Sequence, residues 1–321
     1  MFGSRGRRLL AVAGVGVALA AAGAGVAPAA VAETAGATPT TPTLKGAWAP
    51  LNRCPVDDPA MLAADGVRTV AQCLASRSAS GTMTIGATTV PTGATDLQFG
   101  VVRTGSTYTV VPPAEGAIVA DPVRVPGGLL GLMCPSDIPL ISGICRQVEN
   151  STLNAVTATV LPAGDPSDFD FFAGLAAGRP ILSLPVKIHL ENPFLGRNCH
   201  LGSDAEPIVL RPQNLTAPAA EPVRFDPEGS IDPDGAMGYF ALTGADQGDD
   251  GFAIPRATGC GAFGLLNGAV NLKMGLPSPA GANSLVLDGA QTYFGGFYTP
   301  GEFAPEQGRA LAEHWHAAVA G

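Results

Sequence analysis

Acidic side chains without nearby cations form the first feature of the sequence that could do chemistry. Seven carboxylates lie within 25 residues that contain no Lys or Arg, namely Asp226, Glu228, Asp232, Asp234, Asp246, Asp249 and Asp250. Crowded carboxylates repel one another, and a Ca²⁺ ion, which prefers oxygen ligands, would relieve that repulsion. Asp226, Glu228, Asp232 and Asp234 are therefore the candidate ligands of a calcium site.

The competing interpretation is that these aspartates stabilise turns. Asp232-Pro233-Asp234-Gly235 has the D-x-D-G spacing of a calcium loop, but the rest of such a loop is missing. Aspartate beside Pro or Gly commonly accepts hydrogen bonds from its own backbone. The sequence therefore favours turns over calcium, and the same carboxylates are the candidates if the protein is a hydrolase.

The histidines and the short motifs point to no reaction. His189 would share a strand face with Lys187 and Glu191, either as a general acid–base row or as the solvated face of an edge strand, which we favour. His314 and His316 are two residues apart on an expected helix, so their side chains point to nearly opposite sides. The segment 259–264 matches GxGxxG, but a proline interrupts its approach and its cysteine is expected to be bridged. There is no HExxH or GxSxG motif, and we assign no catalytic residue.

Two Leu- and Gly-rich loops, 126–133 and 263–268, are candidates for binding an apolar ligand. If they are exposed, their leucines would form a patch suited to a lipid, another apolar ligand or a protein partner; these are Leu129, Leu130, Leu265 and Leu266. If they are buried, the loops close the ends of the core. The adjoining cysteines favour burial, because a disulfide tethers a loop to the body of the protein.

The first 32 residues have the form of a signal peptide. Arg5, Arg7 and Arg8 precede an apolar run rich in Ala and Gly, and Ala30-Val31-Ala32 fits a cleavage site. Their removal takes away three arginines and no acidic residue, and lowers the formal net charge from −9 to −12. Such a charge argues against nucleic acid as a partner. We expect a secreted, extracellular protein with no transmembrane segment in the mature chain, whose partner is a cell-envelope component or another protein.

Six cysteines in an exported chain predict three disulfides. Of the 15 pairings that six cysteines allow, we favour those between neighbours in the sequence: Cys54–Cys73, Cys134–Cys145 and Cys199–Cys260. No CxxC or Cys/His spacing indicates a metal centre, so calcium is the one cofactor that remains a candidate.

The elements that must position these residues are mostly short strands. The chain holds 42 Gly and 29 Pro, and 46% of it is hydrophobic. Strand candidates recur at 82–90, 97–103, 107–111, 118–125, 153–161, 182–190, 208–211, 237–242, 284–287 and 292–298. Many short strands with few helices predict a mainly β fold: a single disulfide-stapled β-sandwich or barrel-like domain over 46–300, after a disordered linker at 33–45.

Two patterns are clearer than the rest. Between 182 and 190, five aliphatic residues alternate strictly with polar ones, which predicts a half-buried strand, and Pro185 within it predicts a sheet edge or a bulge. In the C-terminal segment 301–321, Leu311, Trp315 and Val319 recur every four residues. That spacing predicts a short C-terminal helix with one apolar stripe.

Several long segments resemble a family of uncharacterised secreted actinobacterial proteins. They are VPGGLLGL (125–132), PVKIHLENPFLGRNCHLGSDAEPIVLRPQN (185–214), VRFDPEG (223–229) and FAIPRATGCGAFGLLNGAVNLKMGLPSPAG (252–281). The resemblance covers about 44–287. It implies export from a Gram-positive, high-GC bacterium and carries over no catalytic residue.

Three functions are consistent with these patterns. The first is a non-enzymatic secreted or cell-envelope protein with a binding or structural role. The second is a protein that binds a hydrophobic ligand or lipid through the Leu- and Gly-rich loops. The third, a secreted carboxylate-dependent hydrolase, comes last because no nucleophile or metal motif supports it.

Overall fold

A computed structural model describes residues 41–129 and 153–320 of the chain. Residues 41–321 form one compact unit. Several predictions lie outside the described residues: the signal peptide at 1–32, most of the linker, the pair Cys134–Cys145, and Leu130. No helix in the described ranges has both the length and the apolar composition needed to cross a membrane.

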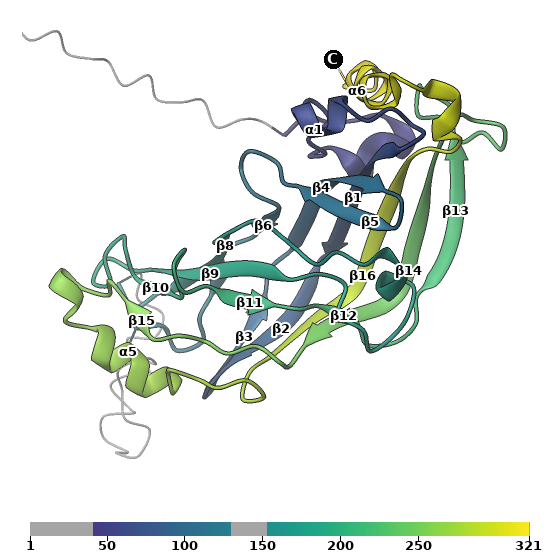
Figure 1. The fold of residues 1–321 in the computed structure, drawn as a ribbon. Helices are drawn as coiled ribbons and strands as arrows, with labels where there is room; N and C mark the ends of the chain where they lie inside the picture. Colours follow the sequence, from purple (N-terminus) through teal and green to yellow (C-terminus); the bar gives the residue numbers. More distant parts are fainter. Residues whose placement is uncertain (1–40, 130–152, 321) are drawn as a thin grey trace, which may run out of the picture. The chain divides into compact units, whose positions relative to one another are not determined.

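The described residues form two antiparallel sheets (Figure 1). The large sheet has ten strands: β1 (Thr69–Ser78), β2 (Ser80–Ile85), β3 (Thr88–Thr92), β4 (Thr95–Thr104), β5 (Thr107–Val111), β6 (Ile118–Ala120), β12 (Gln213–Asn214), β13 (Ala219–Phe225), β14 (Met237–Asp249) and β16 (Ser284–Phe297). The small sheet has six: β7 (Val123–Arg124), β8 (Thr157–Pro162), β9 (Leu184–Glu191), β10 (His200–Leu201), β11 (Ile208–Leu210) and β15 (Ala257–Thr258).

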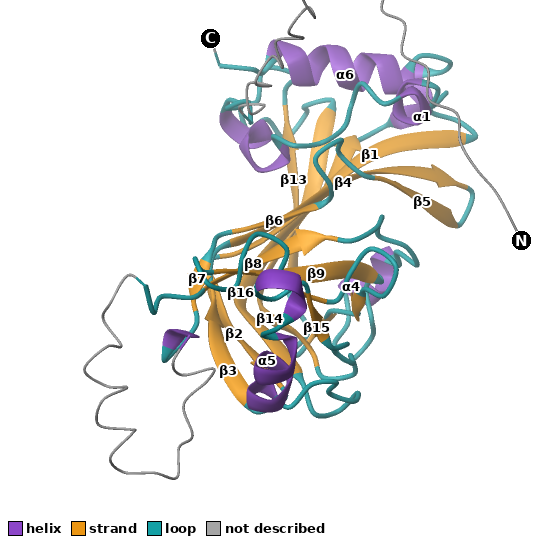
Figure 2. Ribbon diagram, turned by 90° about the vertical axis from the view of Figure 1, so that its left-hand side faces the viewer, coloured by secondary structure: helices purple, strands orange, loops and turns teal. Residues whose placement is uncertain are grey.

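Short helices flank the sheets (Figure 2). They are η1 (Gly46–Leu51), α1 (Pro59–Leu62), α4 (Phe171–Gly174), η2 (Ala262–Gly264), α5 (Asn267–Met274), η3 (Pro300–Phe303) and α6 (Gln307–Ala317). α1 and α6 lie together at one end, whereas α5 lies beside β15 at the other (Figure 1). The predicted C-terminal helix is therefore present, and it buries Leu311 and Trp315 as its apolar stripe requires.

The large sheet is ordered β12-β14-β16-β1-β4-β5, and the small sheet β15-β10-β9-β8-β7. Neither path returns to its first strand. The barrel-like alternative is therefore wrong, and the observed arrangement is two sheets packed face to face. The expected mainly β fold is confirmed.

One core lies between the two sheets. The small sheet contributes the aliphatic residues of the predicted alternation to this core. All five are buried there: Leu182, Leu184, Val186, Ile188 and Leu190. Leu74, Phe99 and Phe294 reach the same core from the large sheet. We call this side of the large sheet its inner face.

A second core lies on the opposite, outer face of the large sheet. Small residues of β1 pack there against the N-terminal segment and α6: Ala71, Cys73 and Ala75. Trp48 and Trp315 fill the layer above them, and the Trp315 indole Nε1–H donates to the carbonyl of Leu51. Leu44 is buried in this core and bridges Val319. The ordered unit therefore includes residues that the sequence assigned to the linker.

β9 is not an edge strand. It pairs with β8 on one side and with β10 and β11 on the other. Pro185 is tolerated because the β8 ladder ends at the pair Pro162–Val186, so that Pro185 itself has no partner in the ladder with β8. The expectation of a sheet edge at Pro185 was wrong for this local reason.

Two disulfides join described residues, and both match the predicted pairs: Cys54–Cys73 and Cys199–Cys260. The first ties the N-terminal segment to β1, and the second ties the loop before β10 to the segment after β15. Disulfides of this kind are typical of an oxidising, extracytoplasmic compartment.

We expect the two disulfides to differ in their contribution to stability. Their sequence separations are 61 and 19 residues, and loop-closure entropy gives about 4 kcal/mol for Cys199–Cys260 and about 3 kcal/mol for Cys54–Cys73. Denaturant titration of the two Cys→Ala double variants measures this. A larger loss for the Cys54/Cys73 pair would contradict the entropic account.

Gln307 provides a second test of the fold. It is fully buried, its Oε1 accepts from Ala71 N–H at 2.8 Å, and its Nε2 donates to Ala71 C=O at 2.9 Å. Gln307→Met keeps the volume but leaves both backbone groups unpaired, so we expect the free energy of unfolding to fall by about 3 kcal/mol. The exposed Gln291→Met is the control and should change it by less than about 0.5 kcal/mol. Equal effects at the two positions would show that the side-chain bonds of Gln307 are not what holds α6 to β1.

Candidate functional site

The inner face of the large sheet carries a row of hollows. Alternate residues of β1 point to this face: Val70 and Gln72 line a groove, Leu74 and Ser76 line a middle cavity, and Ser76 and Ser78 line an inner cavity. β4 and β16 follow the same order, with Leu97 and Phe294 each lining two neighbouring hollows. The row therefore runs along the strands.

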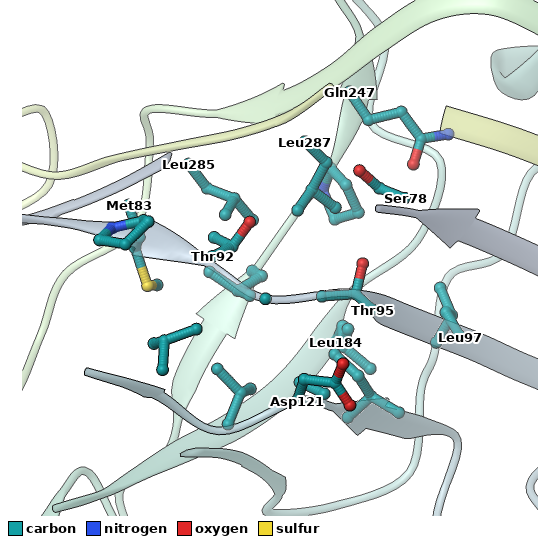
Figure 3. Close-up of a pocket in the computed structure, with 18 of the residues that line it drawn as sticks. Ser78, Met83, Thr92, Thr95, Leu97, Asp121, Leu184, Gln247, Leu285 and Leu287 are labelled. Atoms are coloured by element: carbon teal, nitrogen blue, oxygen red, sulfur yellow. The ribbon is translucent and has the colours of Figure 1, made fainter. Parts of the chain in front are cut away.

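The inner cavity lies between the two sheets and has a volume of about 80 Å³. Met83, Leu285 and Leu287 line it from the large sheet, and Leu184 faces them from β9 (Figure 3). Side chains of β8 and β11 complete a wall that is almost entirely apolar. A single water needs about 10–15 Å³, so this space is several times larger than a packing defect that one water fills.

The middle cavity is narrower, at about 30 Å³. It shares Leu97 and Gln247 with the inner cavity, and Phe171 and Phe294 with the groove. The rings of those two phenylalanines lie 4.7 Å apart. They form the partition between the middle cavity and the groove.

The aromatic groove has a volume of about 570 Å³, within the usual range of ligand sites. Tyr108, Phe172 and Phe240 line it together with the two partition residues. Its floor includes Gly238 and Gly296, which lie directly opposite each other in the β14–β16 ladder. A Cβ at position 296 would lie 3.9 Å from Gln72 Cγ, so the groove owes part of its depth to these glycines.

Unpartnered polar atoms lie towards both ends of the row. Three buried side-chain N or O atoms lack a hydrogen-bond partner in the described part of the chain: Gln72 Oε1, Thr92 Oγ1 and His189 Nε2. Gln72 lines the groove and Thr92 lines the inner cavity. A buried unpaired polar group costs about 1–3 kcal/mol. Two of them in one row of hollows favour a ligand that supplies their partners.

The charges at the two ends differ. A hollow of about 390 Å³ outside the inner cavity shares Ser78, Thr95 and Asp121 with it, and Asp96 and Asp288 also line this outer hollow. Arg77, the one cation among the described residues that line it, is paired with Asp96 at 3.2 Å. By contrast, the only charged side chain that lines the groove in the described structure is Arg103.

The proposed calcium ligands are not gathered into a metal site. Asp226 Oδ1 accepts from Ser230 N–H at 2.7 Å, and Asp232 Oδ1 accepts from Asp234 N–H at 2.9 Å. Both aspartates thus serve turns, as the competing interpretation expected. Throughout the described ranges, Glu228 and Asp234 included, no three His, Cys, Asp or Glu side chains are placed to hold a metal ion.

Two further carboxylates of the acidic stretch also accept hydrogen bonds from the backbone. Asp249 Oδ2 accepts from Arg211 N–H at 2.6 Å, and Asp246 Oδ1 accepts from Gly289 N–H at 2.8 Å. These bonds anchor β14 to its neighbours. Asp246 and Asp249 therefore have structural contacts to backbone groups.

The four leucines of the predicted ligand patch are not brought together as one exposed surface. Leu129 is buried in the core between the sheets, with 8% of its surface exposed. Leu266 packs against the edge of that core. Leu265 is 79% exposed, and Leu130 lies outside the described residues. Leu129 of the first loop is thus buried whereas Leu265 of the second is exposed, so the two loops do not present one common apolar surface.

Lys187, His189 and Glu191 share the partly exposed face of β9, as the alternation predicted, and His189 also belongs to a cross-strand pair. His189 stands opposite His200 in the β9–β10 ladder, and their rings stack with centres 4.8 Å apart. Lys187 pairs instead with Asp204 at 2.6 Å. His316 pairs with Asp57 at 2.8 Å, whereas the ring of His314 contacts Phe297.

Comparison with protein-family models, with curated proteins and with solved structures found no match.

The row of hollows was missed in the sequence because β1 itself was missed. In β1, larger residues alternate with small ones, as Val70, Gln72 and Leu74 alternate with Ala71, Cys73 and Ala75. That pattern is a signal for a strand packed on both faces, with close packing on the small-residue side. A search for apolar–polar alternation does not find it.

Thr92 and Thr292 provide a matched test of the unpartnered hydroxyl. Thr92→Val removes Oγ1, which has no partner, and we expect the free energy of unfolding to rise by about 1 kcal/mol. Thr292→Val removes the group bonded to Ser76 Oγ at 2.8 Å, and we expect a fall of about 1 kcal/mol. Urea titration measures both. A fall for Thr92→Val would mean that its hydroxyl has a partner in the folded protein.

Proposed function

We propose that the protein is an exported binding protein whose ligand is an elongated apolar molecule held along the inner face of the large sheet. The observation that carries the proposal is the row of hollows on the alternate residues of β1. From Val70 to Ser78 this row spans about 26 Å at about 3.3 Å per residue. That length suits a hydrocarbon chain better than a compact molecule.

The composition of the walls supports the same class of ligand. The inner cavity is lined by aliphatic side chains of both sheets, and the groove mainly by aromatic ones. Burial of each methylene group contributes about 0.8 kcal/mol. The few polar groups, Gln72 and Thr92 among them, are placed at intervals along the row, as in sites where isolated polar groups fix the orientation of an apolar ligand.

The middle cavity must widen to admit a chain. Phe171 and Phe294 stand at its entrance, and Phe171 begins the four-residue helix α4. Phe172, its neighbour, is largely exposed. Side-chain rotamer changes are common on binding, and a short helix at the surface offers little resistance to them. We therefore place the opening movement at α4.

Export is part of the proposal. The signal-peptide pattern, the two disulfides and the resemblance to secreted actinobacterial proteins support it. Asp226, Asp232, Asp246 and Asp249 of the acidic stretch accept hydrogen bonds from backbone N–H groups, which supports a structural role for these four residues rather than hydrolysis.

A chain-length series tests the proposal. Alkan-1-ols of eight to eighteen carbons are titrated against the protein loaded with the neutral fluorophore N-phenyl-1-naphthylamine. We expect saturable displacement, with affinity rising about fourfold per methylene until the row is full. Absence of saturable binding by the fluorophore and every alcohol would overturn the proposal.

The variant Ala158→Leu tests whether the hydrocarbon chain of the ligand occupies the inner cavity. Ala158 is buried and lines the inner cavity. The larger leucine side chain should therefore occupy part of this cavity, and the affinity should stop rising at a shorter alcohol than in the native protein. Ala290→Val fills the same cavity from β16 and serves if Ala158→Leu is overpacked. Ala219→Leu, at an exposed position of β13, is the control. An unchanged length profile in both cavity variants would show that the ligand does not occupy the inner cavity.

A further inference from the structure

The charges along the row indicate which end of a ligand is polar. Arg103 is half-buried on the groove wall, and no carboxylate pairs with it in the described structure; its guanidinium donates to the Gly105 carbonyl at 3.2 Å. It faces Tyr108 in the β4–β5 ladder and Val70 in the β1–β4 ladder. An arginine that has no carboxylate partner and stands on the wall of a groove can bind an anionic group.

Gln72 lies beside this cation. In the β1–β4 ladder Val70 stands opposite Arg103, and Gln72 is the next residue of β1 on the same face. Such diagonal neighbours lie about 7–8 Å apart, within reach of long side chains. Gln72 Oε1 has no hydrogen-bond partner, so the side-chain amide can rotate and present its N–H₂ donors instead. Gln72 and Arg103 therefore form a pair that suits an oxyanion.

A second cation stands at the far wall of the groove. The Arg224 guanidinium lies 4.1 Å from the ring centre of Tyr298, which lines the groove, and donates to the Gly235 carbonyl. It adds positive potential without entering the site. The groove is therefore positive at both walls while its surface is mainly aromatic.

The opposite end of the row repels anions. Asp96, Asp121 and Asp288 line the outer hollow beside the inner cavity; among the described residues Arg77 is the one cation that lines both hollows, and it is already paired with Asp96. Asp121 also lines the inner cavity (Figure 3). An anionic group placed there would meet like charge. The two ends thus differ in sign.

We infer that the ligand is a single-chain amphiphile with an anionic head group, and that it lies with the head in the aromatic groove at Arg103 and the tail in the inner cavity towards Thr92. The inference rests on the proposed function and adds the charge and the direction of the ligand. Tyr108 and Gln72 supply hydrogen bonds to the head, while the two partition phenylalanines contact the first part of the chain.

Paired probes test the charge. Oleate is compared with oleyl alcohol, which has the same chain and a neutral head, and with oleoyl lysophosphatidate, which has a phosphate head. We expect oleate or the lysophosphatidate to bind at least about tenfold more tightly than the alcohol, as a charge-assisted bond implies; which of them binds more tightly distinguishes a carboxylate from a phosphate head. The preference should weaken as salt is raised.

Arg103→Gln should remove this preference by lowering the affinity for oleate and for the lysophosphatidate towards that for oleyl alcohol. Arg309→Gln is the control, because Arg309 is exposed on α6, which packs on the outer face of the sheet. If all three probes bind equally to the native protein, or if Arg103→Gln leaves the preference intact, the inference fails while the proposed function stands. If none of the probes binds, the proposed function fails as well.

A photoreactive probe tests the direction. An oleate analogue with a diazirine at its terminal carbon should label the segment 80–92, which contains Met83 and Thr92. Label at Tyr108 or Phe172 instead would place the tail in the groove and overturn the orientation. Gly296→Leu, which fills the groove floor, should reduce labelling of 80–92; unchanged labelling in this variant would also contradict the assignment.

Discussion

The close packing of β1 on both of its faces is the constraint on which the rest of the structure depends. On the outer face, Ala71, Cys73 and Ala75 are small enough to let the N-terminal segment and α6 approach the sheet. Gln307 completes this contact by pairing both backbone groups of Ala71 at a point beyond the end of the β16 ladder. Because the outer face is covered so closely, the inner face of the same strand is left to meet the small sheet.

On the inner face the two sheets do not fill all the space between them. β1 contributes Gln72, Ser76 and Ser78 to this face in addition to Leu74. Polar side chains of this kind cannot interdigitate with aliphatic neighbours as leucine does, and hydrogen bonds satisfy only some of them. A core that has kept polar groups and empty volume along one line has given up stability there, which is typical of a binding site rather than of a structural wall.

Several elements were readable from local pattern alone. β5 was predicted with its observed bounds, β9 by strict alternation, and α6 by the spacing of Leu311 and Trp315. The bounds of other strands were not predicted from local pattern. The candidate strand at 82–90 is the hairpin of β2 and β3, turning at Gly86, and the candidates at 284–287 and 292–298 are one long strand, β16. β13 carries Pro222 and polar residues and showed no alternation.

What the sequence by itself determined is local: strand and turn preference, the stripe of α6, the pairing of cysteines that are neighbours in the sequence, and the use of Asp226 and Asp232 in turns. The strands, turns and helix stripe depend on residues close together in the chain, whereas the cysteine pairs follow the order of the cysteines, since Cys199 and Cys260 lie 61 residues apart. Only the tertiary structure decided that Gln72, Arg103 and Phe171 share one groove, or that Thr92 meets Leu184 across a cavity. Those side chains come from strands and loops far apart in sequence, and the register of antiparallel strands, which brings them together, is set by the packing of whole sheets and not by any single segment.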